Sequence, residues 1–357
     1  MSRVRALAGL VPILVALTVT AWGVHAYLRA GPRPDAQPPH SVIVYIKPKT
    51  GVQEIASLLS EAGVIRHRWA FLAVAYLQGA LKRLQAGEYE FSTDASILDV
   101  LRKLGSGRVV THQVTLPEGI TVQEIATLLA GENLVDPARF TALCNDPAFA
   151  ASLRVPAKRL EGYLFPDTYR LTRGMSEEEI IRLMVDRFRQ ALPPDFAAGA
   201  ERLHLTPHEV VTLASLIEKE ARLAEERPLV SAVFHNRLRI NMPLQSDPTA
   251  VYLAPRSPGR ITAADLQRAS PYNTYLFAGL PPGPIANPGF ASIIAALQPA
   301  RAPYLYFVAK NDGSHFFSRT LEQHQRAVRQ YQGARGIEGR APAVSGIPAA
   351  TLGRRVG

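Results

Sequence analysis

Apolar residues recur at helical spacing along Thr206 to Arg227, TPHEVVTLASLIEKEARLAEER. The stripe consists of Val210, Leu213, Ala214, Ile217 and Ala221, a pattern typical of a helix with one face on a core. Thr206, Pro207 and Glu209 predict the start of this helix, as an N-cap, a first-turn proline and a capping-box acid. The pattern therefore predicts one amphipathic helix over the whole segment.

Two carboxylates, Glu218 and Glu220, lie on opposite borders of the apolar stripe. Glu218 is flanked by small and apolar side chains, and partial desolvation raises the pKa of a carboxyl toward the range that a general acid needs. The alternative is a solvated face on which Glu218 and Arg222 form an ordinary i,i+4 pair. Helix geometry alone favours the solvated face and leaves the choice between Glu218 and Glu220 open.

Strand and helix patterns alternate in the rest of the chain. The β-branched run 41–47 predicts a strand, and the helix pattern VQEIASLL at 52–59 returns as VQEIATLL at 122–129. The two copies indicate two related strand-to-helix modules. The segment 84–104 predicts a strand, a cap and another helix, and 303–331 predicts a hairpin and a terminal helix. The chain as a whole is predicted to be α+β.

The amino-terminal segment 6–28 is apolar and long enough to cross a bilayer, and it follows Arg3 and Arg5. We expect an uncleaved anchor in residues 1–29 with its amino terminus on the cytoplasmic side. Residues 30–40 are proline-rich and predict a stiff linker. The expected order is then a small α/β module at 41–108, a larger domain at 109–332 and a disordered tail at 333–357.

Composition narrows the function classes. The 357 residues carry a formal charge of +10, which suits nucleic acid, anionic lipid or an anionic polymer. No helix-turn-helix, zinc-finger or aromatic RNA-binding signature is present, so no nucleic acid is expected as a partner. The single cysteine, Cys144, rules out an internal disulfide and a multi-cysteine metal site, and no cofactor is predicted.

Three polar segments mix aromatic and acidic residues. They are LEGYLFPDTYR with Tyr163 and Asp167, LQSDPTAVY with Gln245 and Asp247, and SPYNTY with Tyr272 and Asn273. Aromatic rings stack on sugars and carboxylates accept hydroxyl hydrogen bonds, but the same residues also occur in buried turns. Pro248 predicts a shaped loop rather than a helix around Asp247, and GLPPGPIANPG predicts a rigid irregular segment.

Seven motifs taken together resemble one known family. They are LEGYLFPDTY, ASLIEKEA, FHNRL, LQSDPTAVY, SPYNTY, GLPPGPIANPG and YLYFVAKNDGSHFFS. The chain resembles the YceG-like (MltG) family of endolytic murein transglycosylases from the anchor to about Tyr331. The module at 41–108 also resembles LysM-like modules that bind cell-wall glycan, with a plain structural subdomain as the alternative.

The family resemblance implies cleavage of the β-1,4 bond between N-acetylmuramic acid and N-acetylglucosamine within peptidoglycan strands, leaving 1,6-anhydro ends. It implies one catalytic glutamate, the first of the E-K-E motif, which is Glu218. It also implies a location at the bacterial inner membrane with the catalytic domain outside, and wall synthases of elongation or division as partners. A single acid suffices where the muramic acid 6-hydroxyl is the nucleophile.

The remaining candidates are expected to act around Glu218. Our hypothesis is that Gln245, Asp247, Tyr272 and Asn273 orient the sugars, while Tyr163 and Asp167 line or brace the same cleft. Two alternatives stay open: a wall-binding scaffold without catalysis, and a muramidase that uses water. A muramidase requires a second carboxylate, for which Asp247 is the sequence candidate.

Overall fold

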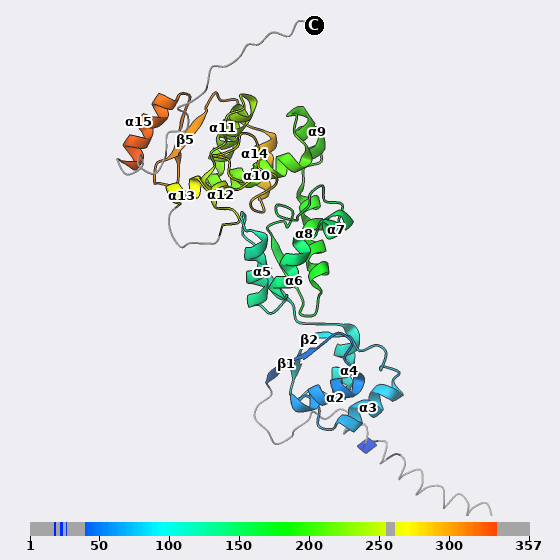
Figure 1. Cartoon of the computed structure of the whole chain (residues 1–357). Helices are drawn as coiled ribbons and strands as arrows, with labels where there is room; N and C mark the ends of the chain where they lie inside the picture. Colours follow the sequence, from blue (N-terminus) through cyan, green and yellow to red (C-terminus); the bar gives the residue numbers. More distant parts are fainter. Residues whose placement is uncertain (1–17, 19–21, 24–25, 27–39, 255–260, 334–357) are drawn as a thin grey trace, which may run out of the picture. The chain divides into compact units, whose positions relative to one another are not determined.

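The computed structural model describes residues 18, 22–23, 26, 40–254 and 261–333. Most of the predicted anchor, nearly all of the linker and the predicted tail lie outside these residues. Within the described part of the chain, no helix is both long and apolar enough to span a membrane. Helices and small sheets alternate along the chain (Figure 1), so the predicted mixed α+β fold is confirmed.

The chain divides into two compact units. Unit 1 comprises residues 1–114, 129–135 and 169–176, and unit 2 comprises residues 115–128, 136–168 and 177–357. The boundaries fall inside three elements, which are β3 (His112–Thr115), α5 (Val122–Gly131) and β4 (Thr168–Leu171). β3 and β4 form a two-stranded sheet. The predicted division at 108/109 stays a prediction.

Unit 1 is built on an antiparallel pair, β1 (Ser41–Ile46) and β2 (Gly87–Ser92), in which Ser41 lies opposite Ser92 and Ile46 opposite Gly87. Its helices are α2 (Val52–Glu61), α3 (Arg68–Leu77) and α4 (Ile97–Ser106). Their apolar faces and the inner side of the strands share one core. The predicted strands, cap and helices are therefore confirmed, but α3, which lies between α2 and β2, was not predicted.

Local sequence signals set the ends of α4. The Ser96 hydroxyl accepts a hydrogen bond from the Asp99 backbone N–H, which caps the helix at its start. Gly107 ends it with a φ of 64°, in the left-handed region that glycine adopts without strain. Both copies of the VQEIA motif are also helical, as α2 and α5.

Unit 2 is mostly helical. Its remaining elements are α6 (Pro137–Cys144), α7 (Pro147–Ser152), α8 (Glu177–Ala191), α9 (Phe196–Arg202), α10 (Pro207–Glu220), the 3-10 helix η1 (Ala224–Glu226), α11 (Arg227–Arg239), α12 (Asp247–Val251), α13 (Ala263–Leu266), α14 (Phe290–Leu297), β5 (Tyr306–Ala309), β6 (His315–Ser318) and α15 (Leu321–Gln332). Helix α10 packs against α9, α11, α12 and α14 at the centre of this unit (Figure 1). β5 and β6 form the predicted hairpin, and α15 is the predicted terminal helix.

Two predicted elements differ in the structure. The helix expected to reach Arg227 ends at Glu220, because Ala221 takes an extended conformation. Pro228 lies in the first turn of α11, where a missing N–H is tolerated, so the segment forms separate helices rather than one. Pro248 likewise lies in the first turn of the short helix α12, so the expected loop around Asp247 is partly helical.

Candidate active site

Glu218 lies in the last turn of α10 with only 5% of its side chain exposed. Its Oε2 accepts a hydrogen bond from the backbone N–H of Gly289 at 2.9 Å, and its Oε1 accepts one from the Arg227 guanidinium at 3.2 Å. The solvated-face alternative is therefore wrong. Arg222 lies beyond the end of α10, so the ion pair of Glu218 is with Arg227 from the next helix.

Arg227 is the first residue of α11, and its side chain is 12% exposed. Its Nε donates to the Ser292 hydroxyl of α14 at 3.1 Å, which fixes the guanidinium plane. The same nitrogen that faces Glu218 lies 3.6 Å from Oε2 of Glu118. One buried cation thus stands between two carboxylates.

Glu118 lies in the segment after β3 and is half-exposed. Burial raises the pKa of this carboxyl, the negative charge of Glu218 raises it further, and Arg227 opposes both effects. A Cβ atom at Gly289 would lie 1.9 Å from Oε1 of Glu118, so any larger residue there would displace this carboxyl from its position. Sequence analysis missed Glu118. The sequence signal that could have identified Glu118 was an acid followed by glycine shortly after a strand.

Glu220 has a different environment from Glu218. Its Oε1 accepts a hydrogen bond from the Ser246 hydroxyl at 2.6 Å. The two glutamates therefore point to different segments, Glu218 to the start of α14 and Glu220 to the start of α12. The catalytic role of Glu218 stays a prediction, but the structure separates the two candidates that helix geometry left equal.

Asn287 joins three distant segments next to Glu218. Its side chain is fully buried, and its Oδ1 accepts hydrogen bonds from the N–H groups of Gly162 and Leu164, both at 2.9 Å. Its Nδ2 donates to the Ile120 carbonyl at 2.8 Å and to the Glu161 carboxylate at 3.2 Å. The motifs around residues 120, 162 and 287 are thus held together by one amide.

Glu161 is a further buried carboxylate of this region. Besides the Asn287 amide it accepts hydrogen bonds from the Val122 N–H at 3.1 Å and from the Tyr252 hydroxyl at 3.0 Å. Burial raises the pKa of Glu161 to about 7, with the hydrogen bonds from Val122 and Tyr252 opposing the rise. The Tyr252 ring packs against the predicted site residue Tyr272, with 4.7 Å between ring centroids.

Tyr163 is buried, and its hydroxyl lies 2.8 Å from Nδ1 of His208 in the first turn of α10. The two rings are parallel at a centroid distance of 6.1 Å. Nε2 of His208 lies 3.2 Å from the Pro282 carbonyl oxygen. A Cβ atom at the next residue, Gly283, would contact both His208 and the Tyr272 hydroxyl. Tyr163 therefore braces the start of α10 against the proline-rich segment that carries Asn287 and Gly289.

Gln245 and Asp247 flank the start of α12. Gln245 holds its backbone in the left-handed region, with a φ of 50°, and its Oε1 accepts a 3.3 Å hydrogen bond from Arg237. Asp247 accepts a short hydrogen bond from the Tyr275 hydroxyl. The structure places Glu118 beside the Arg227 and Glu218 pair, so Glu118 joins Asp247 as a candidate for a second carboxylate.

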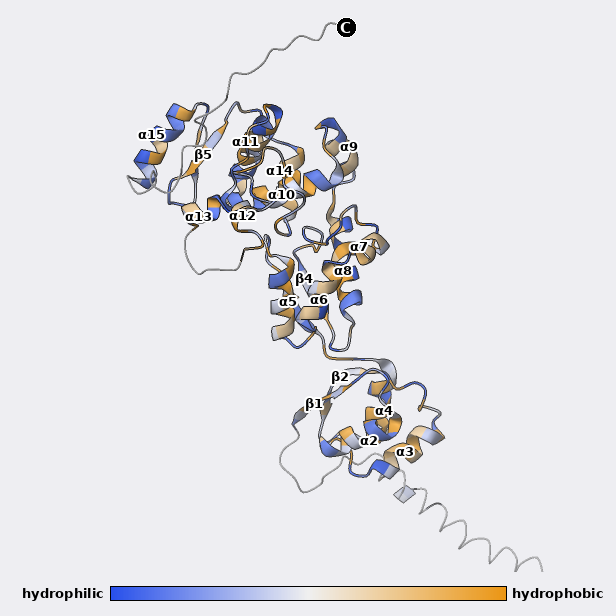
Figure 2. Cartoon of the chain, in the orientation of Figure 1, coloured by the Kyte–Doolittle hydropathy of each residue, from blue (hydrophilic) through white to orange (hydrophobic). Residues whose placement is uncertain are grey.

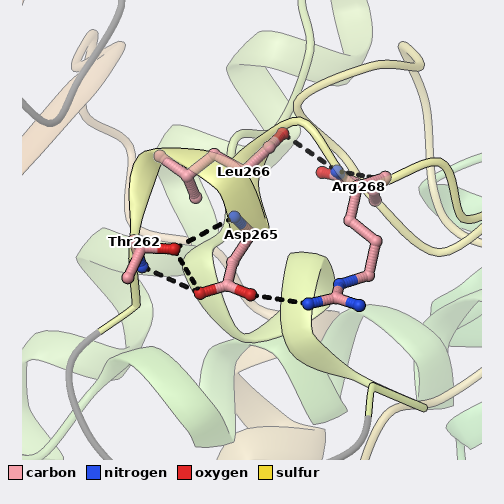
Figure 3. A network of polar contacts seen from close by, with 5 residues as sticks. Thr262, Asp265, Leu266 and Arg268 are labelled. Carbon is pink, nitrogen blue, oxygen red and sulfur yellow. Dashed lines mark hydrogen bonds and ion pairs between the residues drawn. The ribbon is translucent and has the colours of Figure 1, made fainter. Parts of the chain in front are cut away.

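Asn273 is fully buried, and its side-chain amide forms hydrogen bonds within the loop that carries it. Its Nδ2 donates to the carbonyls of Leu266 and Arg268, at 3.0 and 2.9 Å. Those carbonyls belong to α13 and its end, where Thr262, Asp265 and Arg268 form a closed network (Figure 3). Contact between Asn273 and a sugar stays a prediction, because the structure uses its side chain to brace this loop.

Asp167 lies apart from these contacts, in an ion pair with Arg187 of α8 at 2.5 Å. The Arg187 hydrogen bond, followed by the Thr168 backbone N–H, lowers the pKa of Asp167. Its backbone carbonyl accepts a hydrogen bond from Leu116 at 2.9 Å, near the segment that carries Glu118. The structure therefore gives Asp167 a bracing position.

The sequence and the fold together belong to a known class of proteins. The chain belongs to the YceG-like family, whose model matches residues 44–330. It is 35% identical over 307 residues to the endolytic murein transglycosylase of Bacillus subtilis, covering 82% of this chain and 85% of that relative.

Two further comparisons agree. The endolytic murein transglycosylase of Streptococcus pneumoniae is 32% identical over 330 residues, and the match covers 83% of this chain but 59% of that relative. A crystal structure of a yceG-like protein from Listeria monocytogenes matches with a TM-score of 0.56 at 32% identity, covering 81% of this chain and 100% of that one. The family resemblance inferred from the seven motifs is confirmed.

Proposed function

We propose that this chain is a lytic transglycosylase that cleaves the β-1,4 bond between N-acetylmuramic acid and N-acetylglucosamine within peptidoglycan strands and leaves 1,6-anhydro ends. The name shared by the curated relatives supports the substrate and the enzyme class. The observation that carries the proposal for this chain is the buried Glu218 carboxylate, bound by one backbone N–H and one arginine.

In the proposed reaction Glu218 is both acid and base. It enters protonated and gives its proton to the glycosidic oxygen, as the bond from muramic acid C1 to that oxygen breaks. The 6-hydroxyl oxygen of the same muramic acid then bonds to C1, and its proton passes to the Glu218 carboxylate. No water is consumed, the proton count balances, and the enzyme returns to its starting state.

Arg227 and Gly289 suit the middle of this cycle, when Glu218 is ionised. The Gly289 N–H and the Arg227 guanidinium each bind one of its two oxygens, so both stabilise the carboxylate that remains after proton donation. When Glu218 is protonated, Glu118 is the other carboxylate within reach of the Arg227 cation. We propose that Glu118 balances this cation while Glu218 carries its proton.

The sugar-binding assignments remain part of the proposal. Tyr272 offers a partly exposed ring beside the half-buried Tyr252, whose hydroxyl donates to the buried Glu161, and we propose that it stacks on a sugar. Gln245 and Asp247 at the start of α12 are proposed to contact sugar hydroxyl or acetamido groups, and Asn273 to shape the loop that presents Tyr272. Tyr163 and Asp167 are proposed to brace the same site.

The cellular setting is also proposed. Residues 1–29 form a single-pass anchor in the bacterial inner membrane, with residues 30–40 as linker. The module at 41–108 is a LysM-like glycan-binding module, and residues 109–332 carry catalysis outside the cytoplasm. The expected protein partners are wall synthases of elongation or division, since an enzyme that ends strands must meet the enzymes that make them.

The test compares peptidoglycan digested by the wild-type chain, by Glu218→Gln and by Glu220→Gln, with products identified by mass spectrometry. We expect 1,6-anhydro fragments from the wild type and from Glu220→Gln, and none from Glu218→Gln, because only Glu218 lies between Gly289 and Arg227. Loss of activity in Glu220→Gln alone would move the acid to the other glutamate. No products from the wild type, with glycan binding retained, would favour a scaffold.

One observation favours a muramidase as the second candidate. Glu118 is a second carboxylate beside the same Arg227 nitrogen as Glu218, and a hydrolase uses two carboxylates. Reducing-end products from the wild type, with incorporation of ¹⁸O from labelled water, would establish this reaction. Anhydro ends without ¹⁸O would exclude it.

A further inference from the structure

Helix α3 of unit 1 is apolar on its outer side as well as on its inner side. Ala70, Phe71, Val74 and Ala75 are buried in the core of unit 1. On the opposite side Trp69, Tyr76 and Leu77 are 67%, 72% and 81% exposed. Figure 2 shows the hydrophobic colouring along α3. A helix that is apolar all round is expected in a protein core or in contact with lipid, and the outer side of α3 is not in the core.

The outer residues form one surface. Trp69, Tyr76 and Leu77 lie at i, i+7 and i+8, which places them on one side of the helix, with the small Ala73 at i+4 between them. Leu81, which follows the helix, is also exposed, at 37%. We call these residues, Trp69, Ala73, Tyr76, Leu77 and Leu81, the α3 face. Its large side chains are an indole, a phenol and two leucines, the residue types found at bilayer interfaces.

Basic residues border the α3 face, and acidic ones are absent from its part of the sequence. Between Glu61 and Glu88 the chain has no Asp or Glu, but it has Arg66, Arg68, Lys82 and Arg83, all of them exposed. Arg66 and Arg68 stand at the start of α3, and Lys82 and Arg83 follow its end. An apolar centre whose flanking sequence carries only basic charges is complementary to a surface of anionic lipid headgroups.

The position of the module along the chain agrees with this occupant. β1 begins at Ser41, and residues 30–40 separate it from the anchor proposed above. A fully extended linker of that length reaches at most about 36 Å, so the module stays close to the bilayer. A glycan strand is the less suitable occupant, because sugar sites place acidic and amide groups beside aromatic rings, and the α3 face has neither.

We propose that the α3 face docks on the membrane, with Trp69, Tyr76 and Leu77 at the boundary of headgroups and acyl chains and the four basic residues among anionic headgroups. Membrane docking of this module goes beyond the proposed function. It rests on that function only because the proposed anchor keeps the module near the bilayer. Docking would fix how the amino-terminal module faces the membrane, which a linker alone does not.

The two tryptophans of the chain allow a direct test. In the full-length Trp22→Phe protein, Trp69 is the sole tryptophan and reports on the α3 face. In the matched Trp69→Phe protein, Trp22 reports on the anchor. Both are reconstituted into phosphatidylcholine vesicles with and without phosphatidylglycerol, and emission is measured with and without brominated lipid.

We expect Trp69 emission to shift to shorter wavelength and to be quenched by brominated lipid, more strongly in vesicles that contain phosphatidylglycerol. Adding Lys82→Gln and Arg83→Gln is expected to weaken docking roughly 30-fold, because each basic side chain near an anionic surface contributes roughly fivefold. Lys47→Gln with Lys49→Gln removes the same charge from exposed residues outside α3 and its borders, and is expected to leave the signal unchanged.

Each outcome has a distinct meaning. Unquenched Trp69 with water-like emission, while Trp22 is quenched, overturns docking and leaves the anchor intact. Quenched Trp69 with unquenched Trp22 supports docking and refutes the anchor. A Trp69 shift produced by soluble peptidoglycan strands but not by anionic vesicles overturns docking in favour of a glycan surface. Because peptidoglycan cleavage is measured separately, failure here does not bear on catalysis.

Discussion

Side chains two residues apart have different surroundings in this protein. Glu218 is closed off by Gly289 and Arg227, whereas Glu220 binds Ser246. The sequence placed both glutamates on the borders of one helix, but not the partners that α11, α12 and α14 bring to them. Those partners depend on tertiary contacts between residues far apart in the chain, which periodicity does not encode.

The pairing of Glu118 with Arg227 predicts an effect on activity. In Glu118→Gln the Arg227 cation loses one of its two carboxylate neighbours, and a neutral amide does not balance its charge in the proposed cycle. The kcat/KM for glycan cleavage is expected to fall roughly fivefold, the factor that corresponds to about 1 kcal/mol of ion-pair energy. An unchanged kcat/KM would show that Glu118 takes no part in the reaction.

Glu161 predicts a pH-dependent stability. Its folded pKa is raised by burial from 4.5 to about 7, so the folded protein binds a proton that the unfolded chain releases at lower pH. Stability is therefore lost as pH rises from about 4.5 to about 7, by up to about 3 kcal/mol. The Glu161→Gln variant lacks this loss, so its free energy of unfolding relative to wild type is expected to rise across that window.

Urea denaturation at several pH values between 4.5 and 7.5 measures this difference. The lost hydrogen bonds change the free energy of unfolding of the variant equally at every pH. The expected change of the free-energy difference with pH is therefore the same whether the variant is more or less stable than the wild type. Parallel curves for wild type and Glu161→Gln would contradict the assignment of the titration to this carboxyl.

At the scale of elements, local signals were sufficient where a helix starts. The Thr206 hydroxyl accepts from the Glu209 N–H, and the Glu209 carboxylate accepts from the Thr206 N–H, which is the capping box that the sequence predicted. The start of α4 at Ser96 and the VQEIA helices followed their sequence signals as well.

The capping box of α10 predicts a stability effect. Thr206→Ala removes the side-chain acceptor of the Glu209 N–H and is expected to lower the free energy of unfolding by about 1 kcal/mol. Thr262→Ala is the matched control, because α13 has the same capping box but buries no residue. Its effect is expected to be smaller. Equal effects of the two substitutions would show that the packing of α10 does not add to the capping contribution.

Helix ends were less predictable than helix starts. Apolar spacing continues from α10 through Ala221, so the pattern gave no sign of the break after Glu220. The break has a consequence for the site, because it lets the chain turn and return Arg227 to Glu218. An unbroken helix over 206–227 would have placed Arg227 more than two turns away from that carboxylate, at about 13 Å along the axis.

At the scale of the molecule, the α+β class followed from the sequence, and the family followed from seven motifs, but helices such as α3, α9 and α14 were not predicted. The grouping of these motifs around Glu218 did not, because Glu161 and Asn287 looked like residues of ordinary turns until their mutual contacts were seen. Glu118 was overlooked for the same reason. Its partner Arg227 lies more than a hundred residues later in the chain.

The reactivity of the single cysteine measures how often unit 2 opens locally. Cys144 is buried at the end of α6, and burial, followed by the negative charge of Glu161, raises the pKa of its thiol. Both effects suppress the reactive thiolate. Reaction with a thiol reagent is expected to be at least roughly 100-fold slower in native buffer than in urea. Rapid reaction in native buffer would show that unit 2 opens near α6 without global unfolding.

The Asn287 amide also bears on when the protein becomes competent to act. Its side-chain hydrogen bonds reach partners 125, 123 and 167 residues earlier in the chain, and Gly289 lies two residues beyond it. During synthesis, Glu218 therefore emerges 71 residues before Gly289, one of the two residues that bind its carboxylate. A nascent or carboxy-terminally truncated chain carries the glutamate without its surroundings, so the order of synthesis itself delays activity until the fold is nearly complete.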